Sequence, residues 1–270
     1  MIGAPKGRGR AMAKMIVRSV GVAGRFCGRW QRFHVRRVVI LPAFPNAGEL
    51  PGVKADQGVA MADIKEYYER YWDNPDEYYD PTTPQRTALL RAHAAGLAKG
   101  SKVLDVGCGR GEFVKLFAEM GYAAEGIDIS EVGISYARTQ HPDCTFHCGP
   151  VEGMLPERKG MYDFVFSSEV IEHLFDVGTY LEAINRLLKP GGLFIITTPY
   201  HGLLKNISVD LLNYTKHYDP LGQHIRFFDT KGMRMCLEKW GFAPKVWTGY
   251  GRPWPFWKSF FVVSTKAHEA

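Results

Sequence analysis

An acid and three closely spaced glycines mark the place where this sequence has its clearest capacity for chemistry. Asp105 lies in the apolar run at residues 102–106, and Gly107, Gly109 and Gly111 follow it. Glycines have no Cβ, so the backbone can approach a ligand closely, and the helix expected next presents free N–H groups at its start. The spacing Gly-x-Gly-x-Gly differs from the Gly-x-Gly-x-x-Gly of nicotinamide-binding folds. An acid beside it suits a ligand with a cationic end.

A second acid, Asp128, lies 19 residues after Gly109, at the end of the next expected strand. A carboxylate in that position can accept hydrogen bonds from both hydroxyls of a ribose. The alternative is that Asp128 caps the helix expected to begin at Ser130 and Glu131. Together with the glycine loop, the position favours a ligand-binding role.

Histidines are the candidates for acid–base chemistry. His173 follows the fourth expected strand, which ends at the expected ligand cleft, and histidine titrates near neutral pH. It is the leading candidate for a general base, and the alternative is a histidine that packs against a helix or caps a backbone group. His201, His217 and His224 lie in residues 200–227, which we expect to be irregular and to cover a substrate pocket. The alternative there is a solvated loop.

Cysteines and histidines between residues 141 and 148 have the side-chain types of metal ligands. On a strand, however, Cys144 and Cys148 would share one face and His147 would point to the other, so we expect no metal site. The chain has five cysteines, an odd number without close pairs. This usage is typical of reduced thiols in a cytoplasmic protein.

Alternating elements must position these groups. Hydrophobic residues make up 46% of the 270 residues and charged residues 23%, which is ordinary for a globular chain. After a charged helix that ends near residue 74 and a second helix over residues 84–98, strands alternate with helices, which predicts βαβ units. We expect seven strands in one mostly parallel sheet, at residues 102–106, 123–129, 144–148, 162–166, 193–198, 243–248 and 259–265.

The first 60 residues differ in charge from the rest. They hold 11 Lys and Arg against two acids, whereas residues 61–270 carry a net charge of −3. We expect this extension to be poorly ordered, and three interpretations remain open: an upstream extension of a chain that naturally starts at Met61, an organelle-targeting peptide, and a surface-binding tail. The tail would use residues 12–37 as a basic amphipathic helix that contacts a membrane peripherally.

Four motifs in this order resemble class I S-adenosylmethionine-dependent methyltransferases, within them the ubiquinone-biosynthesis O-methyltransferase-like group. They are residues 105–111, 126–130, 162–174 and 188–192, which read DVGCGRG, GIDIS, YDFVFSSEVIEHL and LKPGG. The resemblance covers about residues 61–270. It implies an α/β, Rossmann-like fold with a doubly wound, seven-stranded and mostly parallel sheet in the strand order 3-2-1-4-5-7-6. It also implies an N-terminal helical lid at residues 61–98 and a substrate-covering insertion at residues 200–227.

The resemblance further implies which residues hold S-adenosyl-L-methionine. The methionine end would lie against Asp105 and residues 107–111, including Cys108, and the ribose and adenine against Asp128 and Ile129. Ser167 and Ser168 would form the edge of the fourth strand, and Arg86 stands where related enzymes have an arginine before the glycine motif. Related enzymes often have an acid near the adenine where this chain has Pro150, so Glu152 or the backbone of Val151 would serve instead.

The function that these features predict is transfer of a methyl group from S-adenosyl-L-methionine to a small-molecule acceptor. We expect an oxygen of an aromatic, isoprenoid or lipid-linked compound, enclosed by Tyr67, Tyr71 and the insertion. The alternatives are a cofactor-binding module without catalysis and an RNA-modifying methyltransferase that uses the basic extension. The net charge of residues 61–270 argues against nucleic acid as a partner. The oligomeric state stays open.

Overall fold

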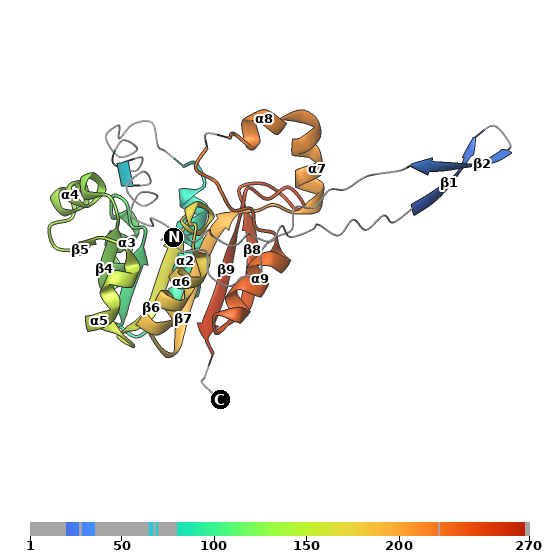
Figure 1. Cartoon of the computed structure of the whole chain (residues 1–270). Helices are drawn as coiled ribbons and strands as arrows, with labels where there is room; N and C mark the ends of the chain where they lie inside the picture. Colours follow the sequence, from blue (N-terminus) through green and yellow to red (C-terminus); the bar gives the residue numbers. More distant parts are fainter. Residues whose placement is uncertain are drawn as a thin grey trace, which may run out of the picture. The chain divides into compact units, whose positions relative to one another are not determined.

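The computed structural model describes residues 20–26, 29–35, 65, 66, 69, 80–220 and 222–267. The chain divides into two compact units, Met1–Asp56 and Gln57–Ala270. The second unit carries every motif singled out in the sequence (Figure 1).

In the first unit, β1 (Val20–Phe26) pairs antiparallel with β2 (Arg29–Val35). The alternative of a basic amphipathic helix over residues 12–37 is therefore wrong. Gly21 and Gly24 disfavour a helix, and valine is a β-branched residue that favours strands. We expected residues 1–60 to be poorly ordered. Apart from β1 and β2, these residues lie outside the described part of the chain, so the expectation stays a prediction.

The second unit is built on one seven-stranded sheet in the order β5-β4-β3-β6-β7-β9-β8. Numbered within this sheet, the order is the predicted 3-2-1-4-5-7-6, and the last strand, β9, runs antiparallel to both of its neighbours. The α/β, doubly wound fold is confirmed. The strands are β3 (Lys102–Val106), β4 (Ala123–Asp128), β5 (Thr145–Cys148), β6 (Tyr162–Ser168), β7 (Leu188–Pro199), β8 (Phe242–Tyr250) and β9 (Ser259–Lys266).

Helices cover both faces of the sheet because neighbouring strand residues point to opposite sides. On one face, Phe164 and Phe166 pack with α2 (Thr83–Ala94) and α3 (Glu112–Glu119). On the other face, Val165 packs with α6 (Val177–Leu187) and α9 (Thr230–Lys239). The remaining helix of the βαβ units, α4 (Glu131–Gln140), packs on β5 and α3.

The segment at residues 200–227, expected to be irregular, contains two helices, α7 (Leu203–Leu212) and α8 (Tyr214–His217). These helices were not predicted, because their apolar residues do not form a stripe buried against the core. Leu203 and Leu212 are 74% and 84% exposed. The helix expected over residues 84–98 ends at Ala94, and the short helices η2 (Val151–Met154), α5 (Leu155–Arg158) and η3 (Ile171–His173) were also missed.

Among the residues that the structure describes, no helix is both long enough and apolar enough to cross a membrane.

The aromatic contacts under α3 give a first testable prediction. Phe117 is fully buried and meets Phe164 and Phe166 edge-on, with ring centroids 5.3 and 5.9 Å apart. We expect Phe117→Ala to lower the free energy of unfolding by about 3–5 kcal/mol, because it leaves a cavity between helix and sheet. Chemical denaturation would measure the change. Leu212→Ala, at an exposed site, is the control, and an equal loss in both variants would contradict this core assignment.

Candidate active site

The glycine loop joins the end of β3 to α3, and its conformation requires glycine. Gly107, Gly109 and Gly111 have φ of 75°, 49° and 84°, a region that residues with a Cβ rarely adopt. A Cβ on Gly111 would lie 2.7 Å from the ring of Phe146, and one on Gly107 would collide with Val170. The loop therefore presents bare backbone at the carboxyl end of the sheet, where open α/β folds bind their ligands.

Asp105 is the buried acid of this loop. Its side chain is 1% exposed, and its Oδ2 has no hydrogen-bond partner among the described residues. Burial raises its pKa well above the ordinary value, and the charges of Glu112 and Asp128 add to the effect. A buried, unpaired carboxylate is costly, so its persistence at a strand end indicates a place for a cationic group.

Asp128 connects the glycine loop with the next helix. Its Oδ2 accepts a hydrogen bond from the Gly109 N–H and its Oδ1 one from the Ser130 N–H, both at 2.9 Å. Ser130 itself caps α4, because its Oγ accepts from the Gly133 N–H. The alternative role of Asp128 as the helix cap is therefore wrong. A carboxylate has about four acceptor sites, so Asp128 retains capacity for ribose hydroxyls.

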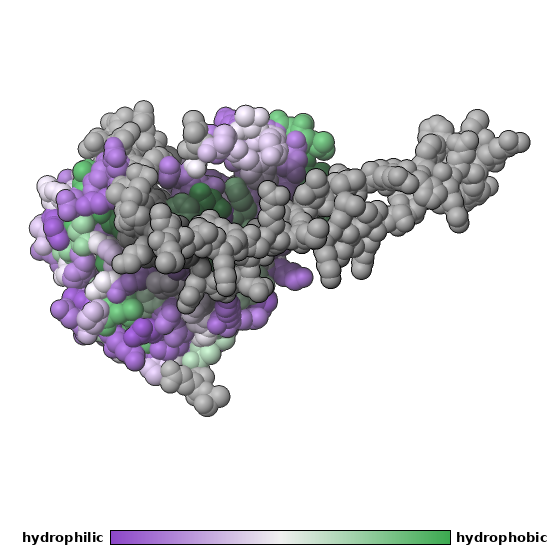
Figure 2. All heavy atoms as spheres, viewed as in Figure 1, coloured by the Kyte–Doolittle hydropathy of each residue, from purple (hydrophilic) through white to green (hydrophobic). Residues whose placement is uncertain are grey.

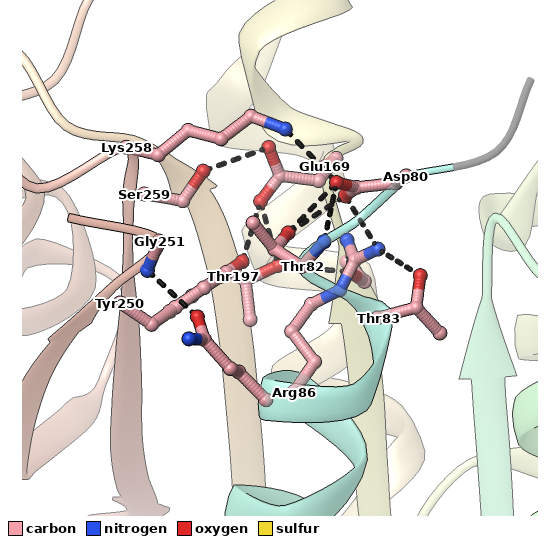
Figure 3. Close-up of polar contacts among 12 residues, drawn as sticks. Asp80, Thr82, Thr83, Arg86, Glu169, Thr197, Tyr250, Gly251, Lys258 and Ser259 are labelled. Carbon is pink, nitrogen blue, oxygen red and sulfur yellow. Dashed lines mark hydrogen bonds and ion pairs between the residues drawn. The ribbon is translucent and has the colours of Figure 1, made fainter.

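Arg86 reaches this site from α2. Its Nη1 donates to the Ser168 Oγ at 2.9 Å, at the end of β6, and its Nη2 donates to the Asp80 Oδ2 at 2.8 Å (Figure 3). The side chain is buried, and its Nε has no partner among the described residues. Ser167 lies beside Ser168, but its hydroxyl hydrogen-bonds the Tyr180 hydroxyl on α6. Arg86 and Ser168 are therefore in direct contact, whereas the Ser167 side chain is held within the core; their roles in cofactor binding stay predictions.

The side of the site near β4 and β5 is more apolar. Val151 begins η2 and is 4% exposed in the main core, and Cys108 is 6% exposed. Ile129 follows β4 directly and is half-buried, as is Glu152. Pro150 is extended and precedes η2. On this side, Ile129 and Val151 provide apolar surface and backbone groups. Glu152, which follows Val151 in the sequence, is the adjacent acid.

His173 lies in η3, after β6. Its Nδ1 is 3.0 Å from the Gln223 carbonyl oxygen, which can only accept, so Nδ1 carries the proton and Nε2 is the basic nitrogen. Burial and the neighbouring His224 lower the pKa of His173 to about 4. The imidazole is therefore neutral at physiological pH, although its basicity is weak.

Glu172, His173 and His224 form a cluster whose potential ligand atoms lie within 4.8 Å of one another. Among the described residues, these three side chains are close enough together to serve as ligands of one metal ion. The sequence analysis missed it because His224 is some 50 residues away, in the insertion. The expected absence of a metal site stays a prediction, since no observation here tests it.

The other two predicted histidines lie together on the insertion. The rings of His201 and His217 are 5.3 Å apart, and His201 also meets Phe227 at 4.8 Å. Burial lowers the pKa of His201 to about 3, with Lys205 and the other histidines adding to it. His201 and His217 thus form one pair, and His224 forms another with His173. Tyr67 and Tyr71 lie outside the described residues.

Two further acids, Glu169 and Glu172, were not predicted from the sequence as site residues. Glu169 follows β6 with φ of 56°, the only non-glycine residue with positive φ in the described ranges. Its carboxylate accepts hydrogen bonds from the hydroxyls of Thr197, Tyr250 and Ser259 (Figure 3). Burial raises its pKa and that of Glu172, whose Oε2 accepts from Thr198. A Glu-x-x-Glu-His pattern was visible in the sequence, but only the fold shows that Glu172 is buried and Glu169 half-buried.

Comparison with known proteins places the chain in a family. Residues 72–245 match a family described as "Methyltransferase domain". A ubiquinone biosynthesis O-methyltransferase of Acinetobacter baumannii is 35% identical over 193 residues, covering 67% of this chain and 80% of the relative. One of Acinetobacter baylyi is 35% identical over 136 residues, 48% of this chain, but the alignment spans only 57% of that relative's length.

Solved structures share the fold at low sequence identity. A 1,6-didemethyltoxoflavin-N1-methyltransferase of Burkholderia thailandensis has a TM-score of 0.61 and 21% identity, covering 80% of this chain and 92% of that one. The magnesium protoporphyrin IX methyltransferase of Synechocystis has a TM-score of 0.59 and 18% identity, covering 77% and 100%. The chain therefore belongs to the methyltransferase domain family, as a class I S-adenosylmethionine-dependent methyltransferase of the kind that its motifs predict.

Proposed function

We propose that this protein transfers a methyl group from S-adenosyl-L-methionine to an oxygen of a small molecule. The observation that carries the proposal is the buried Asp105 carboxylate, unpaired at Oδ2 and placed beside a glycine loop that leaves no room for a Cβ. Such a group needs a cationic partner, and the loop provides bare backbone next to it. The amino-acid end of S-adenosylmethionine carries an ammonium group that meets this need.

The residues around Asp105 fit the rest of the cofactor. Arg86 offers a buried guanidinium with an unpartnered Nε to the cofactor carboxylate. Asp128 retains acceptor sites for the ribose hydroxyls, with Gly109 and Ser130 fixing its orientation. Ile129 and Val151 would line the adenine. The pocket would be completed by residues of the glycine loop and of the end of β6: Gly107, Cys108, Gly111 and Ser168. Ser167 would hold β6 against α6 through its hydrogen bond to Tyr180. Asp105 would thus bind the ammonium group of the cofactor's amino-acid end, and Arg86 would bind its carboxylate.

When bound, S-adenosylmethionine supplies a methyl group already activated by its sulfonium. The protein's contribution is to orient the acceptor and exclude water. An oxygen acceptor must also lose a proton, and we assign that step to Nε2 of His173, because its Nδ1 is held by the Gln223 carbonyl. The insertion, residues 200–227, would cover the acceptor and place His201, His217 and His224 around it. Residues 61–98, with Tyr67 and Tyr71, would form the lid of the domain at residues 61–270.

The exposed surface of the insertion supports an apolar acceptor. Leu203, Leu204, Ile207 and Leu211 follow one another along α7, and all are between 47% and 78% exposed. Figure 2 shows this apolar surface at the upper right of the view. Together with the relatives that are named ubiquinone biosynthesis O-methyltransferases, it favours an aromatic, isoprenoid or lipid-linked compound. The cytoplasmic location, and the expectations about nucleic acid and a peripheral membrane contact, stay predictions.

Ligand-dependent stability tests the cofactor assignment. We expect S-adenosylmethionine and S-adenosylhomocysteine to raise the melting temperature of the full-length protein by several degrees and NAD to leave it unchanged. A ligand at ~100 times its Kd adds about 2.7 kcal/mol, which is several degrees for a domain of this size. Differential scanning fluorimetry would measure the shifts. A shift with NAD alone would contradict the assignment. A shift with the two adenosyl ligands but no methylated product in an acceptor screen would favour a non-catalytic cofactor-binding module.

Asp105 predicts a pH dependence of cofactor binding. Its pKa is raised well above normal in the free protein, and a bound ammonium group would favour the ionised carboxylate. S-adenosylhomocysteine should therefore bind with release of a proton, and its affinity should rise as pH rises through that raised pKa. Calorimetry in buffers of different ionisation enthalpy would measure this proton release. The measurement is made between about pH 5.5 and 7, because the α-amino group of the ligand, with a pKa near 8, stays charged in that range. Asp105→Asn should weaken binding and abolish its pH dependence; an unchanged pH dependence would contradict this role.

His173 predicts the acid limb of the rate profile. Because its pKa is lowered to about 4, the neutral base is present throughout the neutral range. We expect kcat/KM to stay level as pH falls to about 5.5, rather than to decline near the usual ~6.5 of histidine. His173→Gln should lower kcat about 10²- to 10⁴-fold while leaving the Kd of S-adenosylhomocysteine unchanged. A normal kcat in this variant would remove His173 from the chemistry.

A further inference from the structure

Asp80 forms an ion bridge next to the proposed cofactor site. Its carboxylate lies between two cations, with the Arg86 Nη2 2.8 Å from Oδ2 and the Lys258 Nζ 2.9 Å from Oδ1 (Figure 3). The backbone N–H and the hydroxyl of Thr82 also donate to it at 2.9 Å. Burial raises the pKa of Asp80, but the hydrogen bonds from Lys258 and Thr82 and the charge of Arg86 outweigh it, so the pKa lies below normal. Asp80 is thus an ionised and well-satisfied group.

The contacts of Arg86 fix the plane of its guanidinium. Nη2 donates to Asp80 and to the Thr83 Oγ1 at 3.1 Å, while Nη1 donates to Ser168. The carbon of the guanidinium lies 5.7 Å from the ring centroid of Phe113. Asp80 is the ionised partner in this set. Because Nε is buried without a partner, the plane that Asp80 helps to set determines where that N–H points.

Lys258 changes what Asp80 does to the charge of Arg86. A lone carboxylate would neutralise the guanidinium and weaken its attraction for a second carboxylate. With Lys258 on the other oxygen, the three side chains together carry a charge of +1. The position of Lys258 is itself fixed, because its carbonyl oxygen accepts hydrogen bonds from the Tyr200 N–H and the Lys205 Nζ, both at 3.1 Å. The bridge can therefore orient Arg86 and still leave the group attractive to an anion.

We propose that Asp80 is a positioning residue for the cofactor: it holds Arg86 in the orientation that receives the carboxylate of the methionine end, and Lys258 preserves the positive charge that this requires. The proposal rests on the proposed function. It assigns to Asp80 and Lys258 a selective effect on ligands that carry the amino-acid group. A purely structural role, such as closing the turn before α2, would affect all ligands of the site equally.

The test compares two ligands that differ in this group. S-adenosylhomocysteine carries the amino-acid end, and 5′-methylthioadenosine has the same adenosine part without it. We expect Asp80→Asn to raise the Kd of S-adenosylhomocysteine about tenfold, as for loss of a charged orienting contact. The Kd of 5′-methylthioadenosine should change by less than about twofold. Lys258→Met should weaken S-adenosylhomocysteine alone, by about threefold, in the range of partly exposed ion pairs. Isothermal titration calorimetry on the full-length protein would measure both ligands.

Asp163 provides a matched control. It pairs with Lys189 at 2.5 Å, and its side chain is 28% exposed, against 29% for Asp80. It follows the first residue of β6 and accepts from the Lys102 N–H at the start of β3, so it lies at the other end of these strands from Ser168. Asp163→Asn should leave both Kd values unchanged.

Four outcomes would overturn the proposal. Equal weakening of both ligands by Asp80→Asn would show a structural role, and unchanged binding of S-adenosylhomocysteine would show that Arg86 is oriented without Asp80. If Asp80→Asn does not fold, Lys258→Met gives the same comparison, and equal effects on both ligands count against the proposal. Failure of the unmodified protein to bind either ligand would instead refute the proposed function, and this proposal with it.

Discussion

The two hydrogen bonds that Asp128 accepts hold the glycine loop and the start of α4 in one arrangement. Gly109 donates from the loop after β3, and Ser130 donates from the cap of the helix after β4. Parallel strands β3 and β4 bring these two turns to the same edge of the sheet. The loop runs through three positive φ angles that only glycine adopts easily. The N–H groups of Gly107 and Cys108 donate to the Ile127 carbonyl oxygen, and Asp128 accepts from the Gly109 N–H while keeping acceptor sites for a ligand.

Near this arrangement, two buried charged side chains each have one polar atom without a hydrogen-bond partner. Asp105 is buried and unpaired at one oxygen, and Arg86 is buried and unpaired at one nitrogen. Each unpaired atom is costly when buried, although the charge of Arg86 partly stabilises the Asp105 carboxylate. An α-amino acid group, with its ammonium and carboxylate on one carbon, would satisfy both at once. Buried groups therefore define the chemical class of the ligand more narrowly than the overall fold does, since the same fold serves many functions.

The local features of the site could be predicted from the sequence, whereas its long-range contacts could not. The glycine loop and Asp128 depend on residues close in sequence, and the strands predicted from short apolar runs are present in the sheet. Asp80 and Lys258, by contrast, are 178 residues apart, and no local pattern links them. Glu169 has a positive φ, and its carboxylate accepts from Thr197, 28 residues away in sequence, which no local pattern indicates. The helix α7 was missed because periodicity predicts helices that bury one face, and its leucines are exposed.

Lys258 connects the ion bridge at Arg86 with the start of the segment at residues 200–227. Its side chain holds the counter-ion of Arg86, while its carbonyl oxygen accepts from Tyr200 and Lys205 at the root of the insertion. Burial lowers the pKa of Lys205 to about 8, so the amine stays mostly protonated at neutral pH and keeps donating to that carbonyl. Lys258 is thus the residue that connects the start of the insertion, through its carbonyl oxygen, with the ion bridge at Arg86, through its side chain.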